Sequence, residues 1–123
     1  MEYIIKGKVI KGDGYGRKIG FPTVNLDRRN FLKMKNPPAF GIYAGEVLLK
    51  AKSKKQKAAI IIGPKDKKDL PKIEAHLLGY RGKAYGVKAV FEIKKFLRKF
   101  KKFKSEKELV AQIEKDLERC SRA

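Results

Sequence analysis

Hydrophobic and polar residues alternate in short segments along most of the chain, and this alternation is the period of a β-strand rather than of a helix. Clusters of glycine, proline and charged residues separate the segments, as turns do. The segments expected to be extended are residues 3–10, 21–26, 42–49, 57–62, 72–78 and 85–93. Several short strands with turn signals between them predict an antiparallel sandwich or barrel.

The pattern changes after Phe103, where apolar residues begin to recur at intervals of three and four. Ser105 and Glu108 have the spacing of a capping box, in which a hydroxyl and a carboxylate satisfy free backbone donors of the first helical turn. We therefore expect a C-terminal helix over about residues 105–120 that lays one apolar stripe across the strands. The stripe consists of Leu109, Val110, Ile113 and Leu117, with Glu106, Glu114 and Glu118 toward solvent.

The length and composition set limits on the class of protein. A chain of 123 residues fits one domain, residues 1–123, with a core of its own. The longest apolar run, residues 58–62, is far shorter than the roughly 20 residues that span a bilayer, and the N-terminus enters a strand at once. The single cysteine, Cys120, allows neither an intrachain disulfide nor a thiolate zinc site. A cytoplasmic, monomeric protein without a membrane partner is expected.

The formal net charge of +19 would concentrate any polyanion near the protein. The charge is uneven, since residues 50–72 hold nine lysines against two aspartates. Two interpretations remain open at this point. The lysines either keep exposed strand faces soluble, which we favour, or form a surface for a polyanion.

A glycine-rich segment follows the first strand. Residues 12–20 contain four glycines, so several amide groups could face phosphate oxygens, although the segment could also simply connect two strands. It lacks the Gly-Lys-Ser/Thr ending of a P-loop and leads into an extended stretch rather than a helix. Thr23 and Asn25 then lie two residues apart on one face, and they offer hard oxygens suited to Mg²⁺ or phosphate.

Three blocks of the sequence resemble the riboflavin kinase family. Residues 12–25, GDGYGRKIGFPTVN, are similar to its opening motif, a glycine-rich turn that ends in Pro-Thr-x-Asn. Residues 73–78, then Gly82 and Tyr85-Gly86, resemble the family's Glu-x-His strand and the Tyr-Gly turn after it. Residues 96–103 and 105–116 are similar to its closing strand and helix. The blocks occur in the family's order and cover nearly the whole chain.

The resemblance implies a mainly β fold, a six-stranded antiparallel Greek-key-like β-barrel with a C-terminal helix. It also implies transfer of the γ-phosphoryl group of a nucleoside triphosphate to the 5′-hydroxyl of riboflavin, giving FMN, with Mg²⁺ or another divalent metal. ATP is the family's usual donor, and CTP remains an alternative to test. In bacteria this domain is usually the C-terminal half of a bifunctional protein that also adenylylates FMN. Because Met1 stands just before the first strand, we expect this chain to make FMN and no FAD.

Carried over to this sequence, the resemblance implies a role for each matching residue. Glu74 would be the general base, and Thr23 and Asn25 would hold the metal ion. The residues that would bind nucleotide phosphates are Gly12, Gly14, Gly16, Arg17, Gly20, Thr23 and Asn25. Flavin contacts would come from Tyr85, Arg98 and Phe103. For His76 a structural imidazole is favoured over a group that orients Glu74.

The chain departs from the family's pattern at three places. Tyr15 stands where many relatives carry a second arginine. Residues 64–69, PKDKKD, replace an Arg-Pro-Thr-Phe-like stretch, which predicts a rebuilt loop beside the flavin. The family's glutamate on the closing segment is replaced by Phe100 or Lys101.

Two other functions are alternatives to the kinase. A basic barrel that binds RNA or single-stranded DNA would account for the charge, but the aromatic residues are not clustered as a stacking platform requires. A non-catalytic binder of flavin or nucleotide would share the fold. The presence of Thr23, Asn25 and Glu74 together argues against this second alternative.

Overall fold

The computed structural model describes residues 3–12, 18–21, 23–50, 54–79 and 85–122. Six strands and two helices are assigned within these ranges. The strands are β1 (Tyr3–Ile10), β2 (Thr23–Leu26), β3 (Gly41–Leu49), β4 (Lys54–Lys65), β5 (Pro71–Leu77) and β6 (Lys88–Arg98), and the helices are α2 (Arg29–Leu32) and α3 (Glu106–Arg122). None of the described helices is both long enough and apolar enough to cross a membrane.

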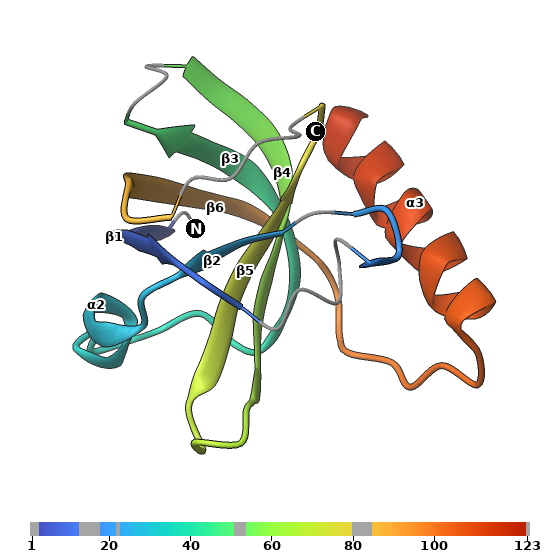
Figure 1. Ribbon diagram of the computed structural model, residues 1–123, viewed down its shortest axis with the longest axis horizontal. Helices are drawn as coiled ribbons and strands as arrows, with labels where there is room; N and C mark the ends of the chain where they lie inside the picture. Colours follow the sequence, from blue (N-terminus) through green and yellow to red (C-terminus); the bar gives the residue numbers. More distant parts are fainter. Residues whose placement is uncertain (1–2, 13–17, 22, 51–53, 80–84, 123) are drawn as a thin grey trace.

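The strands form a closed barrel in the order β1-β2-β5-β4-β3-β6, and β6 pairs back onto β1 (Figure 1). Every neighbouring pair is antiparallel. Within the described residues, closure gives every strand a paired neighbour on both sides. The predicted six-stranded antiparallel barrel is confirmed.

The alternation seen in the sequence separates the barrel interior from its surface. Side chains at every second position point inward and pack into one core. Its most deeply buried large members are Ile5, Leu26, Leu49, Ile60, Ile62, Ile73, Phe91 and Ile93. Burying side chains of this size stabilises the fold by roughly 1.5–3 kcal/mol each relative to exposure.

The observed elements differ from the predicted ones mainly at their ends. The β4 strand runs to Lys65, three residues past the apolar run, because the hairpin to β5 continues the pairing to Lys65 and Pro71. The β6 strand begins at Lys88, not at residue 85, and ends at Arg98. The short helix α2 was not predicted, since four residues give no periodicity, and Phe31 anchors it in the core.

The helix α3 lies along one side of the barrel, across β4 and β3 (Figure 1). It begins as predicted, because the Ser105 hydroxyl accepts a hydrogen bond from the Glu108 amide at 3.2 Å. The other half of the capping box differs, since the Glu108 carboxylate accepts from the amide of Lys104. Cys120 packs on the cross-strand pair Ala44 and Ala59, whose small side chains let the helix approach closely.

A buried ion pair fixes α3 to the end of β6. The Arg98 guanidinium donates to both carboxylate oxygens of Asp116, at 3.0 Å from Nε and 2.7 Å from Nη2. The two side chains are only 13% and 5% exposed. Gln112 also donates to Asp116 at 3.0 Å, so both carboxylate oxygens are hydrogen-bonded. A pair buried this deeply costs much more when one partner is removed than an exposed pair does.

We predict that Asp116→Asn destabilises the protein by about 3 kcal/mol or more, because it leaves the Arg98 charge buried without a counter-ion. Urea unfolding followed by circular dichroism measures the change. Glu118→Gln is the matched control, since Glu118 pairs with Arg122 on the exposed side of the same helix and should change stability by less than about 1 kcal/mol. Equal losses in the two variants would contradict the prediction.

Candidate active site

The residues predicted to hold metal and catalyse the reaction form one row on the outside of the barrel. In the β2–β5 pair, Thr23 lies opposite His76 and Asn25 lies opposite Glu74. The intervening residues, Val24 and Ala75, are 2% and 0% exposed and point inward. The row is therefore on the outer face, because side chains alternate along a strand.

Asn25 is held from both sides. Its Nδ2 donates to the Thr23 hydroxyl at 3.3 Å. On the other side, a Cβ placed on Gly12 would lie 2.4–2.8 Å from the carboxamide atoms of Asn25. Only glycine leaves room for this approach, so Gly12 brings the start of the glycine-rich segment against the row.

A cavity of about 770 Å³ opens over the Asn25–Glu74 end of this row, whereas Thr23 is not among its lining residues. Its wall includes Gly12, Asn25 and Glu74, together with the β4–β5 turn. The Asp66 carboxylate shapes that turn by accepting from the amide of Lys68 at 2.9 Å. The volume lies in the range of ordinary ligand sites.

An ion pair ties the β4–β5 turn to the end of β2. Arg28 donates to Asp66, and both side chains are largely buried. The hydrogen bond from Arg28 lowers the pKa of Asp66 to about 2, with further bonds from the turn amides acting in the same direction. The aspartate is therefore ionised throughout the physiological range, and the turn stays attached beside the cavity.

Basic side chains surround the cavity. They are Lys11, Arg28, Lys65, Lys67, Lys68 and Lys72. Four of them belong to the lysine-rich region, residues 50–72, for which solvation was the favoured interpretation. Their position beside the glycine-rich segment instead gives a positive field where a polyphosphate would enter.

A second, mostly apolar pocket of about 240 Å³ lies between the barrel and α3. Its apolar wall consists of Ile42, Ala59, Ile61, Phe100, Phe103, Leu109 and Ile113. The polar groups in the wall are His76, Lys101 and the Arg98–Asp116 pair. The pocket suits a flat hydrophobic group with a few polar atoms.

The two cavities are lined by neighbouring residues of the β4–β5 pair. Glu74, which lines the basic cavity, lies directly opposite Ile61, which lines the apolar pocket. His76, two residues further along β5, lines the apolar pocket and is paired with Ala59. A ligand with an apolar ring and a polar chain could therefore place the ring under α3 and the chain beside Glu74.

His76 is buried, with 8% of its surface exposed, and its ring meets Phe21 edge-on at 6.3 Å. Burial lowers its pKa to about 4, although the Phe21 carbonyl and the Asp116 charge both act to raise it. Its Nδ1 is buried without a hydrogen-bond partner among the described residues. The imidazole is therefore neutral and packed, and the structural role favoured from the sequence stays a prediction.

The other predicted residues are placed as follows. Arg98 and Phe103, which were predicted to contact the flavin, line the apolar pocket. Tyr85 is not part of that pocket's wall; it is 49% exposed, next to Gly86, whose amide donates to the carbonyl of Val9. Gly20 is exposed with a φ of 93°, a left-handed conformation that favours glycine. Gly14, Gly16 and Arg17 lie outside the described residues, so their roles stay predictions.

Sequence reasoning missed Asp116 and Ile61. Asp116 could have been identified from the sequence pattern, because it lies three residues after Ile113 and four before Cys120, within the buried stripe of α3. A charged residue in such a stripe indicates a buried partner. Ile61 carried no signal, since nothing in a run of three isoleucines shows which one faces a ligand.

The row fits a small divalent cation. The Thr23 hydroxyl and the Asn25 carboxamide oxygen are hard ligands on one face, and Mg²⁺ usually takes one or two protein oxygens together with phosphates and water. Within the described part of the chain, no cluster of three His, Cys, Asp or Glu side chains offers a cage of protein ligands. A divalent cation at this row would therefore need further ligands from a bound phosphate or from water.

Comparisons with known proteins agree with this geometry. The chain is 36% identical over 125 residues to the bifunctional riboflavin kinase/FMN adenylyltransferase of Bacillus subtilis, covering 98% of this chain and 38% of that protein's length. Among solved structures, a macrolide-efflux protein from Streptococcus pneumoniae matches with a TM-score of 0.80 and 28% identity, covering 94% of this chain and 37% of that one. Riboflavin kinase from Trypanosoma brucei shares the fold, with a TM-score of 0.69 at 22% identity over 98% of this chain and 78% of that one.

The name of the streptococcal protein describes that protein alone. The Bacillus relative and the family comparison, by contrast, point to the same family. The family model Flavokinase, described as riboflavin kinase, matches residues 1–123. That match extends from the glycine-rich segment through the Thr23, Asn25 and Glu74 row to the end of α3. The chain belongs to the riboflavin kinase family.

Proposed function

We propose that this chain phosphorylates riboflavin at its 5′-hydroxyl, using a nucleoside triphosphate and a divalent metal, and that it does not adenylylate the FMN product. The observation that carries the proposal is the Asn25–Glu74 pair, because both residues line the basic cavity and Glu74 lies opposite Ile61 of the apolar pocket. One side suits a polyphosphate and the other suits a flat ring. The curated relatives provide the substrate class, and the chain spans 38% of the length of the Bacillus protein.

The isoalloxazine ring is assigned to the apolar pocket under α3. Phe100 and Phe103 offer aromatic faces there, and the Arg98–Asp116 pair holds the helix that closes the pocket. The ribityl chain would run along β5 from His76 toward Glu74. These residues are two positions apart, or about 7 Å along a strand, which is a span that a short polyol chain covers.

Glu74 is assigned as the general base. It is half-buried at the junction of the two cavities, where a ribityl hydroxyl and a γ-phosphate would meet. The carboxylate would take the proton of the 5′-hydroxyl while that oxygen bonds to the γ-phosphorus and the bond to the leaving nucleoside diphosphate breaks. His76 is a poor alternative, because burial opposes its protonated form.

Thr23 and Asn25 are assigned to the metal ion. When bound there, Mg²⁺ would neutralise charge on the phosphates. The Gly12 backbone positions the Asn25 carboxamide, and the lysines of the β4–β5 turn add positive charge at the cavity mouth. Lysines and glycine amides bind phosphate without reading a base, so the identity of the nucleotide has to be measured.

Purified protein incubated with riboflavin, Mg²⁺ and either ATP or CTP should yield FMN and no FAD. The products are separated by chromatography and detected by flavin fluorescence. The nucleotide that supports the reaction identifies the donor. Absence of FMN with both nucleotides, from a protein shown to be folded, would overturn the proposed kinase activity, and accumulation of FAD would overturn the proposal that it stops at FMN.

Glu74→Gln should lower kcat by about 10² or more while riboflavin still binds, because the amide cannot accept the hydroxyl proton. Steady-state rates and quenching of riboflavin fluorescence measure the two effects. Glu46→Gln is the matched control, since Glu46 pairs with Lys94 on the outer surface. A near-normal rate for Glu74→Gln would remove Glu74 from the mechanism.

The pKa of His76 also predicts a pH dependence of stability. Its folded-state value is about 4, whereas the ordinary value is 6.5, so the unfolded chain binds a proton at a higher pH than the folded chain does. The neutral imidazole therefore contributes about 3 kcal/mol to the free energy of unfolding. This stabilisation is fully present above pH 6.5 and is lost as the pH falls toward 4. Urea unfolding measured between pH 6.5 and pH 4 compares the original protein with His76→Asn. The variant should lose less stability over this range, by about 3 kcal/mol. Identical losses in both proteins would contradict it.

A further inference from the structure

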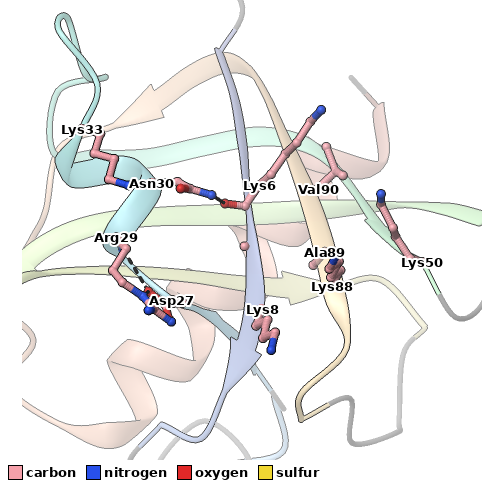
Figure 2. A pocket seen from close by; sticks show the side chains of 11 residues that line it. Lys6, Lys8, Asp27, Arg29, Asn30, Lys33, Lys50, Lys88, Ala89 and Val90 are labelled. Atoms are coloured by element: carbon pink, nitrogen blue, oxygen red, sulfur yellow. Dashed lines mark hydrogen bonds and ion pairs between the residues drawn. The ribbon is translucent and has the colours of Figure 1, made fainter.

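A third cavity, of about 430 Å³, lies on the opposite side of the barrel from α3, beside α2. It shares no lining residue with either cavity of the candidate active site. Figure 2 shows its side chains coming from β1, β6, the end of β3 and the α2 region. Six of them are basic, namely Lys6, Lys8, Arg29, Lys33, Lys50 and Lys88, and we call this set the basic groove.

The charge of the basic groove is not balanced by its own acids. Asp27 is the one carboxylate among the described lining residues, and Arg29 already binds it through its guanidinium at 2.7 Å and its amide at 2.9 Å (Figure 2). Those bonds lower the pKa of Asp27. Within the described part of the chain, none of the five lysines of the groove forms an ion pair with a carboxylate.

The register of β1 and β6 forces two of these lysines together. Lys8 lies directly opposite Lys88 in the antiparallel pair, and like charges in that position destabilise a sheet. The backbone of Lys50 adds to the cluster, since its amide donates to the carbonyl of Lys88 at 3.0 Å. Scattered lysines would be enough for solubility, whereas this arrangement concentrates positive charge in a concave place at a cost in stability.

The composition of the groove favours one kind of occupant. No aromatic side chain is among its described lining residues, so it differs from the apolar and aromatic centre of a protein interface and from a base-stacking platform. It is hollow and lacks large apolar tips, unlike a surface that inserts into lipid. Lysines acting as point charges, with the nearby Asn30 carboxamide, are the groups that contact phosphates without reading sequence.

We propose that the basic groove binds the phosphodiester backbone of double-stranded nucleic acid, independently of sequence. A duplex carries about one charge per 1.7 Å and holds condensed counter-ions, whose release would drive binding. Five lysine contacts correspond to a slope of about −4 to −5 in a plot of log affinity against log salt concentration. The groove is separate from the kinase site, so both could be occupied at once.

The test compares Lys8→Gln/Lys88→Gln with the matched control Lys107→Gln/Lys115→Gln, which removes two exposed lysines from α3. Fluorescence anisotropy with labelled DNA and RNA duplexes of about 20 base pairs, at salt concentrations from about 50 to 200 mM, measures affinity and slope. The groove variant should bind about tenfold or more weakly, with a slope reduced by about 2, and the control should keep the original slope. The two duplexes distinguish DNA from RNA as the ligand.

A second readout uses the repulsion between the two lysines. The groove variant should unfold at a higher urea concentration than the original protein at low salt, and this gain should shrink as salt is added. Its FMN formation, like that of the control, should be unchanged, which separates failure of the groove from failure of the kinase. Lower stability together with retained binding would mean that the lysines have a structural role only and would overturn the proposal.

Competition distinguishes nucleic acid from other polyanions. Poly-glutamate with the same number of charges should displace the duplex about tenfold less well, because an extended peptide carries only about one charge per 3.5 Å. Equal loss of binding in the groove and control variants would overturn the proposal, as would equal competition by poly-glutamate. Tighter binding to single strands than to duplexes would overturn the assignment to a duplex.

Discussion

The register between β2 and β5 is the constraint on which the candidate active site depends. Because Asn25 faces Glu74 across the pair, the carboxamide proposed to hold the metal and the carboxylate proposed as the general base share one face of the barrel. A shift of β2 by one residue would turn Asn25 into the core and bring Val24 to the surface. The apolar side chains that point inward therefore determine the position of the polar ones that point outward.

The same barrel separates two uses of positive charge. Lysines beside the β4–β5 turn surround the cavity that contains Glu74, and Arg28 holds that turn through Asp66. Lysines of the basic groove gather instead on β1, β6 and the end of β3. The composition gives only the net charge of +19 and not its location. The fold gathers the basic side chains into two positive regions on different sides of the molecule.

Much of the fold could be predicted from the sequence, for identifiable reasons. Alternation gave the strands, and it is strongest where one face packs on the core, as in β1 and β5. The helix α3 was predictable because Ser105 marks its start and its apolar residues repeat with helical period. The order of the strands could not be predicted in this way. The pairing of β2 with β5 joins segments about fifty residues apart, and local sequence patterns contain no information on such contacts. Membership of the riboflavin kinase family was also predictable, because three motifs in one order are far more specific than any one of them.

The parts of the site that resisted prediction are those formed by packing between distant segments. The apolar pocket exists because Ala44 and Ala59 let α3 approach the barrel, while Asp116 draws the helix to Arg98 at the end of β6. Neither alanine is unusual by itself, and Asp116 is informative only once its buried neighbours are known. The basic groove arose in the same way, from the pairing of Lys8 with Lys88 across two strands at opposite ends of the sequence. In this small barrel the residues proposed to carry the chemistry stand out in local motifs, but the spaces in which they would act are products of closure.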